Sequence, residues 1–506
     1  MVSIIIRFIF LFGIHIISAE SCIAKDFGNG SPICVCNSTH CDTLESITKV
    51  SAPNYIRYTS NKEGQRFAKE SGKFETSKDD AKNIVSIGTE TFQEIFGFGG
   101  AFTDSTGFNI KSLTEDLQEK ILRAYYTEEG LEYNTGRVPI GGTDFSTHGY
   151  SYCDTENDEP DPELKHFNLT QDDYDYKIPM IQKAQELTKG ELKLFGAAWI
   201  APDWMKTVPG VLARNSFIKE EMYQSWANYV KKFLDSYKKE GISFWGVSTG
   251  NEPTTDLFPN KVPSIAWYPD QMKKWIRENL GPTMRSSDHS DIKIMANDDS
   301  IMSLPSLIEQ LFSDEQVKKY VDGTAVHWYM DNLINANVLN ETHNEFPDKF
   351  ILYTEACNGY IINRPILGSW DGAESYASNI IRNLNHWSIG WTDWNMALNM
   401  EGGPTWTTNY VDSPIIVNAE DNEFYKQPYF YALGHFSKFF TRNSVRLHVT
   451  ADVSSVEVAA VKRPDNGVAV VILNKNSESV DVTLRNEKGD ATLTLTAKSI
   501  NSVIYW

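Results

Sequence analysis

Cysteine is scarce in this chain, with six residues among 506, so disulfides cannot hold the whole molecule together. Basic residues are also few, because 47 Lys and Arg face 67 Asp and Glu and give a formal net charge of −20. Such a surface repels phosphate, which argues against nucleic acid as a partner. Internal repeats and low-complexity tracts are missing too, so the sequence gives no sign of a solenoid.

Long apolar runs are limited to the start of the chain, where residues 4–19 read IIIRFIFLFGIHIISA. This run is too short to span a bilayer comfortably, contains one early Arg7 and ends on the small residues Ser18 and Ala19. It predicts a secretory signal peptide over residues 1–19. A signal anchor is the alternative, because the basic charge before the run is weak. No later segment predicts an integral membrane protein.

Four of the six cysteines crowd the start of the mature chain, where the secretory pathway permits disulfides and three pairings are open. Cys153 and Cys357 are then expected to be free thiols, and irregular spacing argues against a zinc site in CVCNSTHC. The predicted disulfide cysteines are Cys22, Cys34, Cys36 and Cys41. Four sequons predict a glycoprotein, at Asn29, Asn37, Asn168 and Asn340.

Between residues 92 and 395 apolar strands alternate with amphipathic helical stretches, as in a series of βαβ units. In one such stretch, Ser112 and Glu115 predict a capping box. In another, an aromatic stripe from Trp226 to Tyr237 predicts core packing. The eight candidate strands are 95–104, 133–144, 194–204, 244–253, 292–299, 324–329, 350–356 and 389–395.

From residue 444 onward short alternating strands and turn signals predict an antiparallel sandwich, completed by strands between residues 54 and 90. The predicted fold class is therefore α/β, a (β/α)8 TIM barrel with an antiparallel β-sandwich domain and a small disulfide-stapled β segment. The predicted domains are 20–47 with 396–428 for the small segment, 48–91 with 444–506 for the sandwich, and 92–395 with 429–443 for the barrel.

Two of the candidate strands, GVSTGNEP (246–253) and ILYTEAC (351–357), carry a glutamate at the end of an apolar run. At the C-terminal end of a barrel strand, Glu252 and Glu355 would point into the mouth of an active site. Asn251 adds an amide that suits a sugar hydroxyl. Two facing carboxylates are the machinery of glycoside hydrolysis. The alternative is solvated surface, which accounts for most of the 67 acidic residues.

The chain resembles the lysosomal glucosylceramidase (acid β-glucosidase) family over nearly its whole mature length. The motifs that carry the resemblance include GFGGAFTD, YNTGRVP, LGSWDGAE, GWTDWNMALNMEGGP and FYKQPYFYALGHFSKF. The family implies a retaining hydrolase whose acid/base and nucleophile end the fourth and seventh barrel strands. By position these are Glu252 and Glu355, with carboxyl groups about 5 to 5.5 Å apart. Neither step needs a metal or an organic cofactor.

The resemblance also implies residues that grip the glucose, namely Asp144, Trp199, Asn251, Trp394 and Asn409, and residues beside the nucleophile, His327 and Tyr329. Taken alone, Asp144 could form a rim salt bridge, and the tryptophans and His327 could belong to the core. Tyr329 is expected to hydrogen-bond the Glu355 carboxylate. Arg137 is expected to be a buried cation near the strand ends or part of a structural ion pair.

The family further implies glucosylceramide at membrane surfaces as substrate, with anionic lipids and a lipid-presenting activator protein as further partners, and the lysosome as destination. Secretion is the alternative destination. The negative net charge opposes attraction to anionic lipid at neutral pH. Another β-linked glycan is the competing substrate, and a non-catalytic sugar- or lipid-binding glycoprotein is the competing class. Apolar loop residues favour a lipid leaving group: Leu257, Phe258, Ile265, Trp267 and Tyr268.

Overall fold

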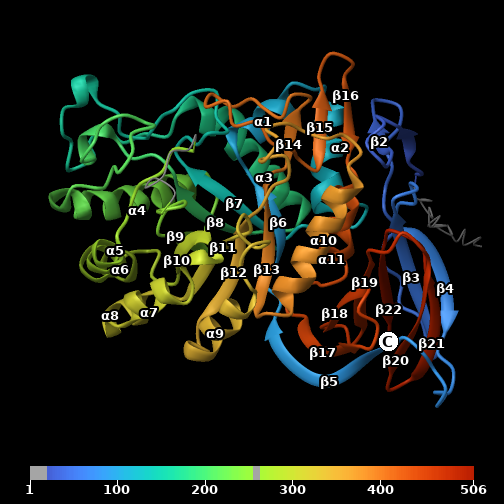
Figure 1. Ribbon diagram of the computed structural model, residues 1–506. Coiled ribbons are helices and arrows are strands. Elements are labelled where there is room, and N and C mark those ends of the chain that lie inside the picture. Colours follow the sequence, from blue (N-terminus) through green and yellow to red (C-terminus); the bar gives the residue numbers. More distant parts are fainter. Residues whose placement is uncertain (1–19, 255–261) are drawn as a thin grey trace, which may run out of the picture.

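Eight parallel strands close into a barrel that occupies the middle of the chain (Figure 1). The computed structural model describes residues 20–254 and 262–506. Each barrel strand overlaps one of the eight predicted segments, so the predicted (β/α)8 barrel is confirmed. In the order of the chain the strands are β6 (Gly97–Ala101), β7 (Thr135–Ile140), β8 (Lys193–Ala198), β9 (Gly246–Ser248), β10 (Lys293–Ser300), β11 (Gly323–His327), β12 (Phe350–Glu355) and β13 (Ser388–Asn395).

Helices cover the outside of the barrel (Figure 1). They are α1 (Asp104–Lys111), α2 (Glu115–Tyr126), α3 (Ile178–Leu187), α4 (Tyr223–Lys239), α5 (Pro269–Trp275), α6 (Gly281–Arg285), α7 (Ser306–Phe312), α8 (Glu315–Tyr320), α9 (Asn337–Glu345), α10 (Trp370–Leu384) and α11 (Pro428–Ser437). The aromatic stripe of α4 is buried, as predicted. The predicted capping box is wrong: Thr114 precedes α2 as its N-cap, and Ser112 Oγ donates to Asn109 O at the end of α1.

A nine-stranded sheet combines segments from both ends of the chain, in the order β21-β20-β5-β17-β18-β19-β22-β3-β4. The predicted contribution of an N-terminal segment is therefore confirmed. The sheet is not wholly antiparallel, because β20 pairs parallel with β5. Its strands are β3 (Asn54–Asn61), β4 (Ala68–Lys73), β5 (Ile84–Glu94), β17 (Val445–Ala451), β18 (Val456–Lys462), β19 (Val468–Asn474), β20 (Val480–Asn486), β21 (Gly489–Leu495) and β22 (Ser499–Tyr505).

A five-stranded sheet joins the N-terminal segment to the stretch after the barrel. Of the three pairings left open, the structure has Cys22–Cys34 and Cys36–Cys41, and Cys153 and Cys357 are free and buried. The strands are β1 (Ile23–Lys25), β2 (Ile33–Cys36), β14 (Ala397–Asn399), β15 (Ile415–Asn418) and β16 (Glu423–Lys426).

Among residues 20–254 and 262–506, no helix has both the length and the apolar character needed to cross a bilayer. The predicted signal peptide, residues 1–19, lies outside this described part.

Candidate active site

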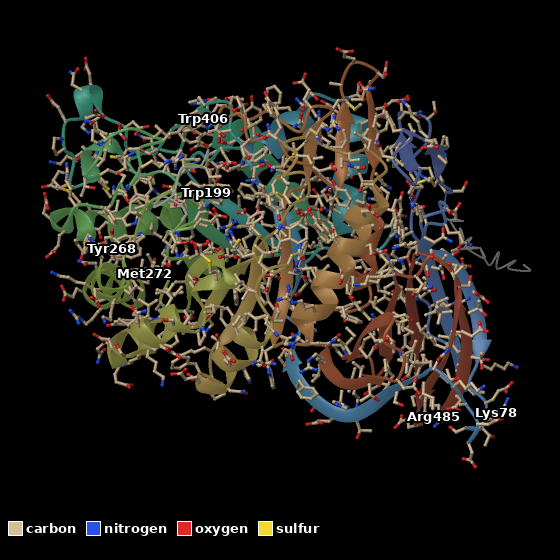
Figure 2. All side chains as sticks on the ribbon, viewed as in Figure 1. Lys78, Trp199, Tyr268, Met272, Trp406 and Arg485 are labelled. Carbon is tan, nitrogen blue, oxygen red and sulfur yellow. A yellow bond between two sulfur atoms is a disulfide. The ribbon has the colours of Figure 1, made fainter. Side chains whose placement is uncertain are left out.

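A cavity of about 340 Å³ opens at the C-terminal ends of the barrel strands. Seven residues predicted from the sequence line it: Asp144, Trp199, Glu252, Tyr329, Glu355, Trp394 and Asn409. Asn251 and His327 are buried and support this lining. Figure 2 shows Trp199 within the barrel and Trp406 above it in the view; the indole N–H of Trp406 donates to Thr143 O at 2.7 Å and so supports the loop that carries Asp144.

Glu252 lies four residues beyond β9, in a turn that needs a left-handed backbone, with φ of 44°. Such a conformation is costly for a residue with a Cβ and persists only where its surroundings hold it. Here Glu252 N–H donates to Asp298 O at 2.9 Å, and Ser264 Oγ donates to Glu252 O at 2.8 Å. The backbone is therefore fixed from both sides, and the carboxylate faces the cavity.

Glu355 is the last residue of β12 and is 5% exposed. Tyr329 OH donates to Glu355 Oε1 at 2.6 Å, which confirms the hydrogen bond expected from the sequence. Arg137 NH1 donates to Glu355 Oε2. Because each oxygen accepts from a different donor, one on β7 and one just after β11, the carboxylate is held in one orientation.

The two glutamates face each other across the cavity. A carboxylate oxygen of Glu252, one of Glu355 and a ring nitrogen of His327 all lie within 4.8 Å of one another. Inverting glycosidases keep their carboxyl groups about 6.5 to 9.5 Å apart to admit a water, whereas retaining ones place them about 5 to 5.5 Å apart. A separation of at most 4.8 Å between one oxygen of each glutamate is compatible with the retaining arrangement.

Asp298 organises the buried groups behind the glutamates, although it is not among the residues predicted from the sequence. Its Oδ2 accepts from Arg137 NH2 at 2.8 Å, and its Oδ1 lies 3.1 Å from His327 Nε2. Burial by itself would raise the pKa of Asp298, but Arg137 and His327 hold this pKa well below its usual range. A permanent negative charge therefore sits between two cations.

His327 connects Asp298 to Glu252, since its Nδ1 lies 2.9 Å from Glu252 Oε1. Burial opposes the charged form, yet the negative charge of Glu355 and the hydrogen bonds to Asp298 and Glu252 raise the pKa of His327 to about 10. The imidazolium donates from both ring nitrogens. Its Nδ1 therefore holds Glu252 Oε1 in place.

The opposite part of the cavity suits a sugar ring. Trp199 and Trp394 stack with centroids 5.1 Å apart, and the Arg137 guanidinium lies 4.6 Å from the Trp199 ring centre. Asn409 Nδ2 donates to Asp144 Oδ2 at 2.9 Å. Burial raises the pKa of Asp144 to about 7, although the Asn409 hydrogen bond opposes this shift. Apolar ring edges thus lie next to a carboxyl and an amide.

The apolar loop residues singled out in the sequence fit this cavity less well than predicted. Ile265 and Trp267 are each 3% exposed, and Trp267 stacks on Trp275 in the core. Tyr268 is half exposed but stacks on Phe217 and does not line the cavity. Leu257 and Phe258 lie outside the described residues. The apolar lining instead includes Phe145, Val262, Met302, Met330 and Tyr360.

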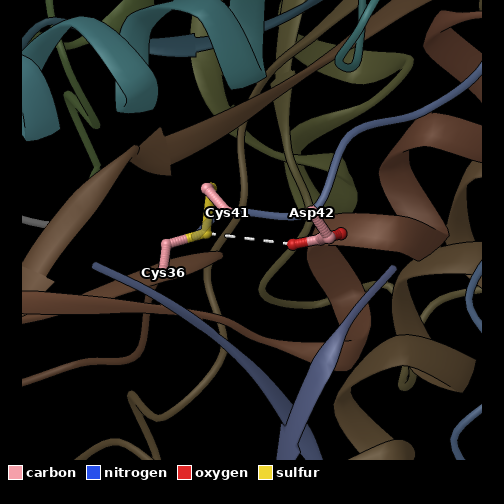
Figure 3. A group of neighbouring side chains, drawn as sticks. All are labelled: Cys36, Cys41 and Asp42. Carbon is pink, nitrogen blue, oxygen red and sulfur yellow. Dashed lines mark hydrogen bonds between the residues drawn. A yellow bond between two sulfur atoms is a disulfide. The ribbon is translucent and has the colours of Figure 1, made fainter. Parts of the chain in front are cut away.

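Two groups in the described chain have the residue types of a metal site, but their contacts are already taken. In the first, Cys36 and Cys41 form a disulfide and offer no thiolate (Figure 3). Its third member, Asp42, binds Lys426 and Tyr431. The second group is Glu252, His327 and Glu355. The cationic His327 and Arg137 that contact its carboxylates would repel a metal ion.

Comparison with known proteins gives consistent matches. The Glycosyl hydrolase family 30 TIM-barrel domain matches residues 95–440, and the Glycosyl hydrolase family 30 beta sandwich domain matches residues 443–503. The lysosomal acid glucosylceramidase of Mus musculus is 41% identical over 92% of each chain. An endo-1,6-beta-D-glucanase of Neurospora crassa is 28% identical over 82% of this chain and 85% of its own. The structure of SrfJ from Salmonella typhimurium aligns with a TM-score of 0.83 and 23% identity, covering 89% of this chain and 99% of SrfJ.

Proposed function

The chain belongs to glycosyl hydrolase family 30 and is a glycoside hydrolase, and from this premise we propose that it cleaves the β-glucosidic bond of glucosylceramide with retention of configuration. The observation that carries the proposal is the pair of facing carboxylates, Glu252 and Glu355, within 4.8 Å at the cavity. The mouse relative named lysosomal acid glucosylceramidase supports the choice of substrate.

In the first step Glu252 donates its proton to the glycosidic oxygen while a carboxylate oxygen of Glu355 attacks the anomeric carbon. The bond from that carbon to the leaving group breaks, ceramide departs as an alcohol, and a glucosyl ester forms on Glu355. Arg137 and Tyr329 hold the attacking carboxylate. Because both are fixed before the substrate arrives, little reorganisation is needed in the transition state.

In the second step the ionised Glu252 removes a proton from a water molecule, whose oxygen bonds to the anomeric carbon and displaces Glu355. The ester C–O bond breaks, and two inversions leave β-glucose. His327 stays protonated in this step although Glu355 is now an uncharged ester, because the anionic Asp298 and Glu252 still accept from its two ring nitrogens. It therefore holds one oxygen of Glu252 in both states and does not itself transfer a proton.

The glucose is held by groups on several strand ends. Asp144 and Asn409 would accept from and donate to sugar hydroxyls, and Trp199 and Trp394 would cover the C–H face of the ring. Asn251 accepts from Arg137 NH2 at 3.0 Å through its Oδ1, so its Nδ2 is turned to donate to a hydroxyl near the reacting carbon.

The proposed setting is the lysosome, reached through the secretory pathway, with extracellular release as the alternative. Anionic lipids and a lipid-presenting activator protein are proposed partners. Four surface asparagines are proposed to carry glycans: Asn29 and Asn168 are exposed, and Asn37 and Asn340 are partly exposed.

The decisive experiment measures glucose release from glucosylceramide in anionic vesicles near pH 5 and from an aryl β-glucoside. Wild type should cleave both, and proton NMR should show β-glucose first. Glu355→Gln should lower kcat on both by more than about 1,000-fold, because it removes the nucleophile. Glu341→Gln, on the exposed face of α9, is the matched control and should retain activity.

Activity on the aryl glucoside alone would instead favour another β-glycosidase of the family. The Neurospora relative, an endo-1,6-beta-D-glucanase, makes a β-1,6-linked glucan the next substrate to test. Activity on none of these substrates would favour a non-catalytic binding protein.

A further inference from the structure

Two consecutive aspartates at the end of β10, Asp298 and Asp299, both lie at the active-site cavity or directly behind its lining. Successive side chains on a regular strand point to opposite faces. Here the register with β11 shifts between Asn297 and Asp299, and Asn297 and Asp298 have φ of 78° and 49°. Such a bulge re-aims side chains. Asp298 points back to Arg137 and His327, whereas Asp299 lines the cavity.

Asp299 is 5% exposed and only partly engaged by the described residues. Its Oδ2 accepts from Thr254 N–H at 3.0 Å and from Thr254 Oγ at 2.6 Å. Its Oδ1 accepts from Ser300 N–H at 2.7 Å. Burial and the negative charge of Glu252 raise the pKa of Asp299 to about 6, and above this pH the ionised carboxylate offers about four acceptor positions. One position on Oδ1 is therefore left for a donor within the cavity.

The cavity has a sugar end and a leaving-group end. Asp144, Asn409 and the two tryptophans form the sugar end, on the Glu355 side. A general acid must contact the glycosidic oxygen, so the leaving group departs past Glu252. Beyond Glu252, the cavity is lined by residues that follow β9, by the last two residues of β10 and by one residue just after β10: Thr254, Val262, Asp299, Ser300 and Met302.

We propose that Asp299 binds the leaving group, by accepting a hydrogen bond from a hydroxyl or amide N–H on the carbon next to the glycosidic one. This inference rests on the proposed function and specifies how its substrate is recognised. An amphiphilic alcohol fits the arrangement, because the hydroxyl or amide next to its glycosidic carbon reaches Asp299 and its apolar chain continues over Val262 and Met302. Met302 is 54% exposed at the rim and so leads outward.

A purely structural role for Asp299 is the competing explanation. Thr254 lies two residues after Glu252, so loss of its hydrogen bonds to Asp299 could displace the general acid. That defect would slow every alkyl glucoside similarly, because all alkyl leaving groups require protonation. Loss of a leaving-group contact would slow only those leaving groups that carry the donor.

The test uses three octyl β-D-glucosides that carry hydrogen, a hydroxyl or an acetamido group on carbon 2 of the octyl chain. The ratio of kcat/KM for a donor-bearing substrate to that for the plain octyl glucoside is measured in wild type, Asp299→Asn and Thr254→Val. A change in the fraction of correctly folded enzyme alters both kcat/KM values equally and therefore cancels in this ratio. We expect Asp299→Asn to lower the ratio about ten-fold for at least one donor substrate. Thr254→Val should change it less than about two-fold, because the carboxylate stays.

An unchanged ratio in Asp299→Asn for both donor substrates would overturn the inference, as would equal losses in the two variants. Wild-type activity on glucosylceramide is measured separately. If glucosylceramide is not cleaved but the kcat/KM ratio still depends on Asp299, glucosylceramide is rejected as the substrate and the leaving-group site at Asp299 is still supported.

Discussion

At the scale of single residues, the site is built from groups whose charge is fixed by their partners. His327 and Arg137 are buried cations, and Asp298 is the buried anion between them. This arrangement supports the different roles that we propose for the two glutamates, although both lie at the same cavity. Asp144 differs from them, because burial raises its pKa to about 7 and it carries less charge in an acidic compartment.

Tyr329→Phe should slow formation of the glucosyl ester by about ten- to a hundred-fold. The change removes the hydrogen bond to Glu355 Oε1 at 2.6 Å, and a bond to a charged group contributes about 1.5–3 kcal/mol. Single-turnover kinetics with an activated aryl β-glucoside measure this step directly.

Tyr360→Phe is the matched control for this change. The Tyr360 ring packs edge-on against Tyr329, with centroids 5.0 Å apart, and its hydroxyl makes no hydrogen bond to Glu355 among the described contacts. Equal effects of the two substitutions would show that the slower step does not come from loss of the Tyr329–Glu355 hydrogen bond.

At the scale of elements, the eight barrel strands could be predicted because each is apolar on both faces and ends in polar or aromatic residues. The positions of Glu252 and Glu355 followed from strand counting. The orientation of Asp298 and Asp299 could not be predicted, because strict alternation would send these neighbours to opposite faces and a bulge leaves no clear signal in the sequence. The capping box failed for a related reason: Thr114 competes with Ser112 for the same helix start.

The bulge in β10 depends on Asn297, whose amide donates to Asp299 O and to Ala325 O, each at 3.0 Å. Its φ of 78° lies in the left-handed region. Both Asn297→Ala and Asn297→Gly lose these bonds, but only alanine also meets the left-handed strain. The alanine variant should therefore be less stable than the glycine variant by about 1 kcal/mol in urea unfolding. Equal stabilities would show that the backbone relaxes when the amide is removed.

At the scale of the whole molecule, the helix that follows the barrel and the nine-stranded sheet share buried polar contacts. His435 of α11 places its ring nitrogens 2.7 Å from Ser502 Oγ and 2.9 Å from Ser60 Oγ. Burial lowers the pKa of His435 to about 3, so this contact stays neutral in an acidic compartment. The domain boundaries stay a prediction, because membership of a sheet does not show which segments fold alone.

The net charge of −20 should make binding to anionic vesicles depend on pH and salt in a specific way. At pH 7 the protein and the membrane repel each other, and the Debye length falls from about 30 Å at 0.01 M salt to about 8 Å at 0.15 M. Salt should therefore increase co-sedimentation at pH 7, the reverse of its effect on a basic protein. At pH 5 protonation of carboxylates weakens the repulsion, so more protein should bind at low salt. Vesicles of neutral lipid are the control and should show neither effect. Binding to anionic vesicles that falls as salt rises at pH 7 would instead reveal a local basic contact strong enough to outweigh the charge of the whole chain.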